Sequence, residues 1–589
     1  MKKGNRTHPE QQGIRQLSNP NTAGGPMNTF ALEEEKLTFY KRIIRSLFGK
    51  KADVTRILLS IVFVALVFIP LIKMFANIDR ESLYKVVNSS SFGGAILNSL
   101  TVATVATVIT TVIAYFLAVC IERTNIRFKS IFGIIFILPM LIPSISNGMG
   151  LIILFGNNGI ITRFLGLSTS IYGMQGIVIG SVLYAFPVAY LMFADVMKYE
   201  DSLPYEAARV LGISKLRQFT AITLPYLRKP LISIIFSTFT LIVTDYGVPL
   251  MVGGKFTTIP VVMYQEVIGQ LNFGKGAIYG CLLLIPAVAA FVIDLLNKDK
   301  GNSGFMAKSF DLTSGRVKKA LAYIYCAIMA LFTALPLLSF VILAFAKDYP
   351  SDTEFTLDNI AKAVNLKADT YLMNSIIIAL LVSIIGVAVA FMTAYMSARM
   401  KSKASKFLHL SAITSAAIPG IVLGLSYVLV FKGSAIYGTI AILVMVNLVH
   451  FIASPYLMMY NSLSKLNENL EGVGHTLGIS RGYMIRDVFI PQCWKTLWEM
   501  FSYFFVNCMM TISAVSFLAT TANKPVSLMI NQFEAQMQME CAAVVSLAIL
   551  GVNLVIKGIV FIVKAVERKK SLTPSSMPQT YQCPLASRF

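Results

Sequence analysis

One short segment combines residue types at a spacing that suggests a purpose. Glu206 is followed at once by Ala207 and Ala208, and then by Gly212 and Pro225. A carboxylate at the start of a helix suits the positive end of the helix dipole or an arginine on a partner protein. The small alanines allow another surface to approach closely, and Gly212 supplies the positive φ with which many helices end. The pattern therefore predicts a short helix that docks onto another protein.

A second, altered copy of this segment lies farther along the chain. Gly478 and Pro491 match the glycine and proline of the first copy, but Gly472 stands at the glutamate position and Glu471 lies one residue earlier. The docking contact of the second segment therefore either lacks the ion pair that Glu206 could form with a partner protein or forms one through Glu471. A single such segment could be an ordinary amphipathic loop helix, whereas two at equivalent places favour docking.

The composition indicates that these segments belong to a membrane protein. The 589 residues are 56% hydrophobic and only 14% charged, with a mean hydropathy of +0.68. Uncharged stretches of about 20 residues recur, enough to cross a hydrocarbon core of about 30 Å. The net charge of +22 does not indicate a nucleic-acid partner, because the cations lie in short segments between apolar stretches. The seven scattered cysteines form no disulfide framework or metal-ligand pattern, so we expect no cofactor and no metal in the chain.

Twelve apolar stretches predict an all-α polytopic membrane protein with twelve transmembrane helices. Lysines and arginines number 39 on the side of the N-terminal tail and 11 on the other side, which predicts that both termini are cytoplasmic. The predicted helices are 57–72, 95–120, 131–155, 177–196, 231–248, 276–296, 320–346, 373–398, 407–431, 437–458, 497–518 and 541–563.

The two halves of the chain resemble each other at fixed offsets in residue number. Arg123 matches Arg399 and Pro143 matches Pro419 at one offset, and later markers, the glycines of the two docking segments among them, match at a slightly shorter one. We therefore predict two parallel six-helix repeats, related by a pseudo-two-fold axis along the membrane normal. The expected parts are a basic cytoplasmic tail (1–55), a first half (56–296), a cytoplasmic linker (297–319), a second half (320–566) and a cytoplasmic tail (567–589).

Polar residues inside the apolar stretches are few, and charge there is costly enough to suggest a function. Asp245 and Tyr246 lie near one end of the fifth predicted helix, and Asn507 and Ser513 lie in the eleventh. We predict that these four line or gate a path across the membrane. For Asp245, a hydrogen-bonded helix end near Pro249 and a contact with an external protein stay open. For Asn507, packing between helices stays open.

The docking segment and its altered copy resemble the coupling motif of permease subunits in binding-protein-dependent ATP-binding-cassette importers. This resemblance implies the type I importer permease fold, with both permease halves fused in one chain of the bacterial cytoplasmic (inner) membrane. It implies as partners two copies of a cytoplasmic ATPase subunit, which holds ATP and Mg, and an extracytoplasmic solute-binding protein, besides membrane lipid. The chain itself is then not an enzyme. Closure of the ATPase dimer on ATP would push the two loops together and open the path outward.

The solute is harder to predict. Residues 244–254 and 264–273 resemble the first half of 2-aminoethylphosphonate permeases, and 505–517 resembles their second half and ferric-iron permeases nearly as well. 2-Aminoethylphosphonate is the expected solute, with ferric iron as the alternative. An ion-coupled secondary transporter is an alternative of another class, although such proteins usually place acids or histidines near the midplane. His450 lies in a predicted helix, and we expect a buried polar contact rather than an iron ligand.

Overall fold

The computed structural model describes residues 54–166, 170–297, 310, 315–400, 402–479 and 481–572. The predicted N-terminal tail up to residue 53, most of the predicted linker and the chain beyond 572 lie outside this part. Within it the chain is almost entirely helical, as the sequence predicts. The departure is one hairpin of two short antiparallel strands, β1 (Ala346–Asp348) and β2 (Asp352–Phe355), in which Ala346 pairs with Phe355.

The helices follow one another with short connections, and several contain a π-helical or 3₁₀ turn, labelled η. The first half contains α2 (Val54–Phe63), η1 (Val64–Phe68), α3 (Ile69–Ala76), α4 (Arg80–Val87), α5 (Phe92–Glu122), α6 (Lys129–Ile137), η2 (Leu138–Leu141), α7 (Ser144–Phe155), α8 (Ile160–Leu165), α9 (Met174–Lys198), α10 (Leu203–Val210), α11 (Lys215–Gln218), η3 (Phe219–Thr223), α12 (Leu224–Val243), α13 (Gly247–Val252), α14 (Ile259–Tyr264), η4 (Gln265–Gly269) and α15 (Phe273–Asn297). The second half contains α16 (Arg316–Ala344), α17 (Asp358–Asn365), α18 (Ala368–Ala398), α19 (Lys403–Thr414), η5 (Ser415–Ala417), α20 (Gly420–Phe431), α21 (Ile440–Phe451), α22 (Ala453–Ser464), α23 (Leu470–Thr476), α24 (Arg481–Met484), η6 (Ile485–Phe489), α25 (Ile490–Gln492), α26 (Trp494–Met510), η7 (Val526–Leu528), α27 (Met529–Ala535) and α28 (Met539–Leu572).

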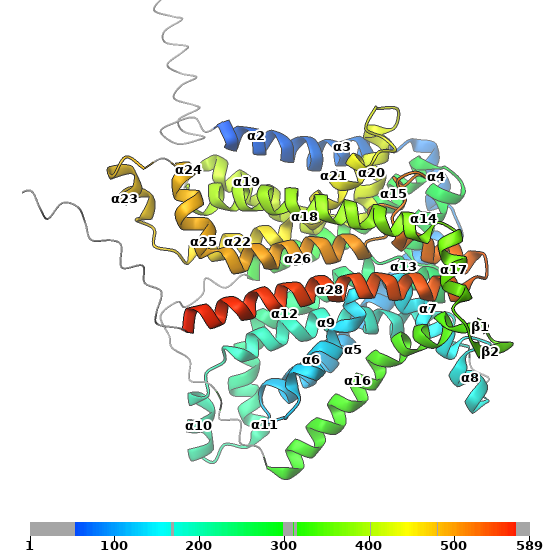
Figure 1. Ribbon diagram of the computed structural model, residues 1–589, viewed down its shortest axis with the longest axis horizontal. Coiled ribbons are helices and arrows are strands. Elements are labelled where there is room, and N and C mark those ends of the chain that lie inside the picture. The colour runs from blue at the N-terminus through cyan, green and yellow to red at the C-terminus, as the bar shows by residue number, and fades with distance from the viewer. Residues whose placement is uncertain are drawn as a thin grey trace, which may run out of the picture. The chain divides into compact units, whose positions relative to one another are not determined.

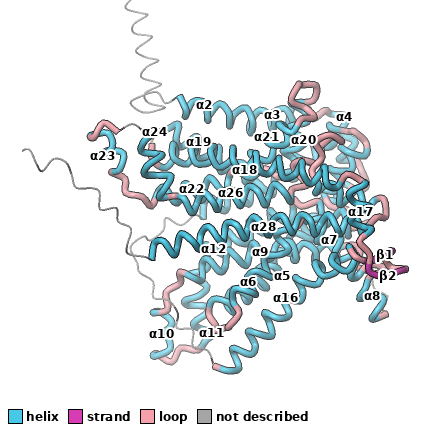
Figure 2. Tube along the Cα trace, in the orientation of Figure 1, coloured by secondary structure: helices cyan, strands magenta, loops and turns pink. Residues whose placement is uncertain are grey.

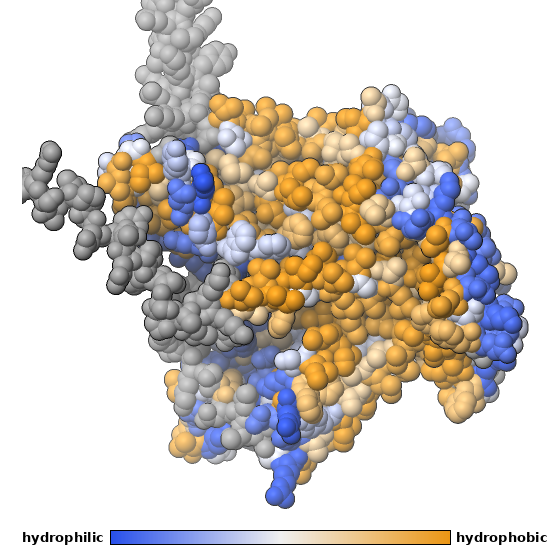
Figure 3. All heavy atoms as spheres, in the orientation of Figure 1, coloured by the Kyte–Doolittle hydropathy of each residue, from blue (hydrophilic) through white to orange (hydrophobic). Residues whose placement is uncertain are grey.

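The long helices lie side by side, and the short elements gather at their two ends (Figure 1). Helices α10, α11, α23 and α24 lie at one end, called here the α10/α23 end (Figures 1 and 2). β1, β2, α8 and α17 lie at the opposite end, called the β1/β2 end. The surface between the ends is mostly apolar, and hydrophilic residues gather towards the ends (Figure 3). This distribution fits a protein whose middle lies in hydrocarbon, where water cannot satisfy polar groups.

Nine helices in the described residues are long and apolar enough to cross a membrane, or up to eleven if the bent pairs α19–α20 and α21–α22 each count as one. α26 has 17 residues and is not among them. The number of twelve stays a prediction, as does the parallel arrangement of the halves. The predicted domain boundaries also stay predictions; α16 begins at Arg316 and α28 extends to Leu572.

Pro143 and Pro419 break the helices predicted at 131–155 and 407–431. A proline lacks an N–H group and favours extended backbone in the residue before it. Ile142 and Ile418 are indeed extended. The chain bends by 108° between the segment formed by α19 and η5 and the helix α20. Each of these two predicted helices is therefore divided at its proline, because apolar composition on both sides of a proline does not restore the missing hydrogen bond.

The helices predicted at 231–248 and 497–518 also end early, at Val243 and Met510. After the first of them, the carboxylate of Asp245 accepts hydrogen bonds from the N–H groups of Gly247 and Val248, which begin a new helix, α13. After the second, the backbone turns to an extended conformation. The stop after α12 therefore involves a polar side chain, and the apolar pattern reveals neither stop.

The leading helix of each half packs against the other half. α2 and α3 lie against α19 and α20, and α16 lies against α5, α6 and α7. The Tyr427 hydroxyl donates to the carbonyl of Leu66 at 2.9 Å, and the Arg56 guanidinium donates to the Ser402 hydroxyl at 2.8 Å. The Arg56 side chain is thus buried against the second half although it begins the first. The two halves are interlocked by these exchanged helices.

Equivalent serines make the same contact in both halves. The Ser99 hydroxyl of α5 accepts a hydrogen bond from the backbone N–H of Ile259 at 2.8 Å. The Ser375 hydroxyl of α18, at the equivalent position of the second half, accepts one from the N–H of Val526, also at 2.8 Å. Each serine therefore satisfies a helix-starting N–H group that has no partner within its own helix.

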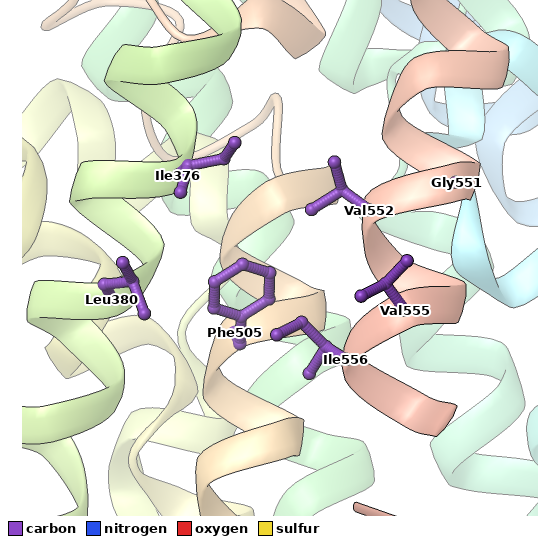
Figure 4. Close-up of a pocket in the computed structure, with 7 residues that line it drawn as sticks. All are labelled: Ile376, Leu380, Phe505, Gly551, Val552, Val555 and Ile556. Atoms are coloured by element: carbon purple, nitrogen blue, oxygen red, sulfur yellow. The ribbon is translucent and has the colours of Figure 1, made fainter. Parts of the chain in front are cut away.

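An apolar groove lies on α18, α26 and α28 and has a volume of about 360 Å³. Figure 4 shows its side chains pointing toward one another from the three helices. The part of the groove formed by α28 includes Val555, which is 61% exposed, so we assign the groove to the membrane-facing surface. The residues that line it are Ile376, Leu380, Phe505, Gly551, Val552, Val555 and Ile556.

The packing of α16 on the first half can be tested with two native cysteines. Cys120 on α5 and Cys326 on α16 are free cysteines that lie next to each other. We expect copper phenanthroline to join them in a disulfide, because the two thiols are neighbours where the helices pack. Mass spectrometry of the digested chain should detect the linked peptides in the native chain and not in Cys326→Ser. Absence of the link in the native chain would contradict this helix exchange.

Candidate functional site

The first docking segment forms the helix α10. Ser202 precedes it, and its hydroxyl donates to the Glu206 carboxylate at 3.0 Å. Ala207 is exposed and Ala208 is buried, so one alanine faces outward and the other packs inward. Gly212 follows with a φ of +67°, the conformation that the sequence predicts for it. Glycine adopts this conformation without the steric cost that other residues pay.

The second segment forms the corresponding helix, α23. Gly478 follows it with a φ of +69°, as Gly212 follows α10. Gly472 is exposed, and Glu471 is half-buried and faces inward to Arg399. Glu471 therefore does not take the outward position of the missing glutamate. The two prolines of the pattern, Pro225 and Pro491, begin the next helices, each directly after a π-helical turn.

Both loop helices expose apolar side chains at the α10/α23 end. Val210 and Leu211 are 88% and 75% exposed at the end of α10. Val473 and Leu477 are 54% and 68% exposed on and just after α23. Apolar side chains gathered on a hydrophilic end of a membrane protein are typical of a surface that binds another protein. The helices are therefore suited to docking, and the coupling role of their residues stays a prediction.

A cavity with apolar and polar side chains in its wall lies between the two halves and has a volume of about 630 Å³. Helices α9, α12 and α15 line it from the first half, and α21, α22 and α26 line it from the second. Three of the four predicted path residues line it, and Tyr246 follows directly after the first of them. The cavity includes the polar residues Tyr184, Ser233, Ser237, Thr240, Thr244, Asp245, Asp294, His450, Ser454, Tyr503, Asn507 and Ser513.

Asp245 both lines the cavity and starts the helix α13. Its carboxylate accepts hydrogen bonds from the Ser144 hydroxyl at 2.6 Å and from the N–H groups of Gly247 and Val248 at 3.3 and 3.0 Å. The hydrogen-bonded helix end that the sequence left open for Asp245 is therefore observed, and its role in a path stays a prediction. The three donors hold the carboxylate in place at the wall of the cavity.

Further polar residues of the cavity come from the second half. Asn507 donates to the carbonyl of Tyr503 in its own helix at 2.8 Å and forms no hydrogen bond with Asp245 among the described contacts. His450 also lines the cavity, and its buried Nδ1 has no hydrogen-bond partner in the described part of the chain. The buried polar contact expected for His450 is therefore not formed through Nδ1. The shorter offset of the repeat could have pointed to His450, because it relates this residue to Tyr184, which lines the cavity from the first half.

Aromatic side chains from both halves meet next to Asp245. The ring of Tyr246 stacks on Tyr264 with 5.1 Å between centroids, and Tyr264 stacks on Phe517 of the second half at 6.3 Å. The Tyr246 hydroxyl is also hydrogen-bonded to the hydroxyl of Ser516. Stacked rings and a hydrogen bond across the two halves form a closed contact where α12 ends. Tyr246 is thus positioned to act as a gate, which stays a prediction.

The sequence matches one protein family twice, once in each half. Residues 110–298 and 386–569 match the family described as binding-protein-dependent transport system inner membrane component, and together they cover more than half of the chain. The chain belongs to this family. Each match contains one loop helix and the helices that line the cavity from that half, so this member of the permease family is a fusion of two permease domains.

Relatives of this permease include subunits of ferric transport systems. It is 24% identical over 471 residues to a putative ferric transport system permease protein FbpB 1 of Haemophilus influenzae, covering 76% of this chain and 74% of that protein. It is also 24% identical over 493 residues to the ferric transport system permease protein FbpB of Actinobacillus pleuropneumoniae, covering 79% and 71%. The relatives are transport subunits rather than enzymes. A solved bacterial alginate ABC transporter with its periplasmic protein shows a distant likeness, with 16% identity and a TM-score of 0.33 over 46% of this chain and 95% of that one.

The structural role of Asp245 can be separated from its charge by two substitutions. We expect Asp245→Ala to lower the free energy of unfolding by about 1–3 kcal/mol, because the buried N–H groups that start α13 lose their acceptor. Asp245→Asn keeps an acceptor oxygen and should cost less. The thermal midpoints of the purified full chain in detergent would measure both. Equal midpoints for Asp245→Ala and the native chain would contradict the helix-starting role.

Proposed function

We propose that this chain is the complete membrane permease of an ATP-driven importer and that its solute is ferric iron. Membership in the binding-protein-dependent permease family supports the importer, and it argues against the ion-coupled secondary transporter. The fused arrangement supports a transporter that needs two ATPase subunits and no second permease. The names of the two ferric relatives favour ferric iron over 2-aminoethylphosphonate. The expectation of 2-aminoethylphosphonate rested on short stretches of sequence alone.

The charge of the central cavity is the observation that carries the choice of solute. Its described lining contains the carboxylates Asp245 and Asp294, the imidazole of His450 and no lysine or arginine. A cavity lined by one sign of charge concentrates ions of the opposite sign and repels ions of the same sign. A cation is therefore favoured there. The phosphonate group of 2-aminoethylphosphonate would meet no cationic side chain in this lining.

The orientation follows from the distribution of lysine and arginine. The predicted positive side is the side of the loops that form the α10/α23 end, so we infer that this end faces the cytoplasm. The exposed apolar side chains of α10 and α23 would then dock onto two ATPase subunits, which bind ATP and Mg. The β1/β2 end would face the external solute-binding protein. Both chain termini would be cytoplasmic, in the inner membrane of a bacterium.

Growth of a strain that lacks the gene tests the solute. We expect slow growth under iron limitation and a low rate of uptake of radioactive ferric iron, both restored by the native gene. Growth on 2-aminoethylphosphonate as the sole phosphorus source should be unchanged. The opposite pattern, a phosphorus defect with normal iron uptake, would replace ferric iron by the phosphonate.

The charge of the cavity can be tested within the chain. Asp245→Asn removes one negative charge from the wall and should lower the rate of ferric-iron uptake by about tenfold, the effect of roughly 1.4 kcal/mol of lost attraction. Asp195→Asn is the matched control, because Asp195 is an exposed acid of α9 outside the cavity lining. Equal uptake by both variants would remove the role of Asp245 in attracting the solute.

A further inference from the structure

In the first half, one buried network joins the loop helix to its surroundings. Arg123, the residue that ends α5, forms an ion pair with Glu200 and a hydrogen bond with the Tyr205 hydroxyl. Tyr205 lies on α10, and its hydroxyl is also hydrogen-bonded to Glu200 and to Thr223 of η3. Glu200 is only 3% exposed. Burial raises the pKa of Tyr205 to about 12, so the phenol keeps its proton.

In the second half, a different set of side chains forms the equivalent network. Arg399 ends α18, and its Nε and Nη2 donate to the two carboxylate oxygens of Glu471 on α23 at 2.7 and 2.6 Å. The same guanidinium donates to the backbone carbonyls of Leu466 and Asn467 at 2.8 and 2.6 Å. The Arg399 side chain is 4% exposed. Its planar fork allows one residue to bind the carboxylate in two places and the backbone besides.

The two networks join the same elements, although their residues differ. The longer offset of the repeat relates Arg123 to Arg399, and the shorter offset relates Tyr205 to Glu471, as equivalent positions require. The guanidinium of Arg399 also lies 5.4 Å from the ring centre of Phe489, the position equivalent to the threonine of η3. The network of Arg123 thus joins the end of α5, the segment after α9, the loop helix α10 and the π-helical turn η3. The network of Arg399 joins the end of α18, the segment after α22, the loop helix α23 and the π-helical turn η6.

This equivalence explains the displaced glutamate of the second segment. Glu471 takes the place of Tyr205 rather than that of Glu206, and it serves as the internal partner of Arg399. The loop helices have 8 and 7 residues. Helices shorter than about 12 residues are barely stable in water alone, so tertiary contacts must determine their orientation. A buried arginine with two or more partners is such a contact.

We propose that Arg123 and Arg399 are positioning residues that lock α10 to α5 and α23 to α18. A movement of a docked ATPase subunit is then passed on to a long membrane helix instead of being lost in a flexible loop. This role rests on the proposed importer function, because it assumes that the loop helices receive the movement of the ATPase. The lock itself is a property of the chain alone and can be measured without any partner.

Hydrogen–deuterium exchange of the purified full chain tests the lock. We expect Arg399→Ala to raise the amide exchange rates in α23 by about tenfold or more, because the half-buried Glu471 and the carbonyls of Leu466 and Asn467 lose their common partner. Exchange in α10 should stay unchanged, and Arg123→Ala should give the reverse pattern. Glu471→Gln removes the ion pair with little change of shape and provides a second variant. Unchanged exchange in α23 for both Arg399→Ala and Glu471→Gln would overturn the proposal.

The control variant is Lys564→Ala. It removes the ion pair between Lys564 and Glu499, with Nζ and Oε1 2.5 Å apart, which joins α28 to α26 and contacts neither loop helix. Exchange in α10 and α23 should match the native chain. Faster exchange in the loop helices of this control would also count against a specific lock, because it would show a general loosening.

The complete transporter, with its own ATPase and binding protein in proteoliposomes, tests what the lock does. We expect Arg399→Ala to lower the number of solute ions imported per ATP hydrolysed by about fivefold or more while hydrolysis continues. Arg399→Lys keeps the charge but not the fork, and it should restore this ratio only in part. If Arg399→Ala imports as many solute ions per ATP hydrolysed as the native transporter, the coupling role is overturned. Failure of the native transporter to import ferric iron would overturn the proposed solute alone, and the exchange experiment would still decide the lock.

Discussion

Hydrocarbon cannot form hydrogen bonds with a backbone, and this constraint governs the membrane part of the protein. A chain in that environment must stay helical unless other protein groups satisfy the N–H and C=O groups that a break exposes. The structure contains such breaks at Pro143, at Pro419 and after α12. The serine hydroxyls of Ser99 and Ser375 satisfy the backbone at equivalent helix starts. The irregular parts of the fold are therefore possible only where side chains from neighbouring helices supply the missing partners.

The need to satisfy backbone groups in hydrocarbon also explains where the cavity between the halves lies. The chain is broken after α12, around Pro419 and between α21 and α22, and these breaks bring polar backbone and side chains to one place. Asp245 illustrates the double use of one group, because its carboxylate starts α13 and also faces the cavity. A membrane protein that must place charge near its middle can stabilise it with hydrogen bonds of this kind. The stacked rings of Tyr246, Tyr264 and Phe517 then close the contact between the halves beside it.

The two loop helices show how a duplicated chain can keep an arrangement while changing its residues. The first half holds its helix through Glu200 and Tyr205, and the second half through Glu471. In both, the arginine and the elements that it joins are equivalent. What differs is the outer surface, because Glu206 has no counterpart at Gly472. The two loop helices therefore differ in charge at this position while being supported in the same way.

Local patterns in the sequence determined much of this protein. Apolar stretches predicted the long helices, and the spacing of glycine and proline predicted the loop helices and the positive φ of Gly212 and Gly478. These features depend on residues that are neighbours along the chain. Only the tertiary structure decided the exchange of the leading helices, the partner of Glu471 and the place of His450 in the cavity. Each depends on groups far apart in sequence, such as Arg56 and Ser402 or Arg399 and Glu471, and no local pattern records which distant polar group will satisfy a buried one.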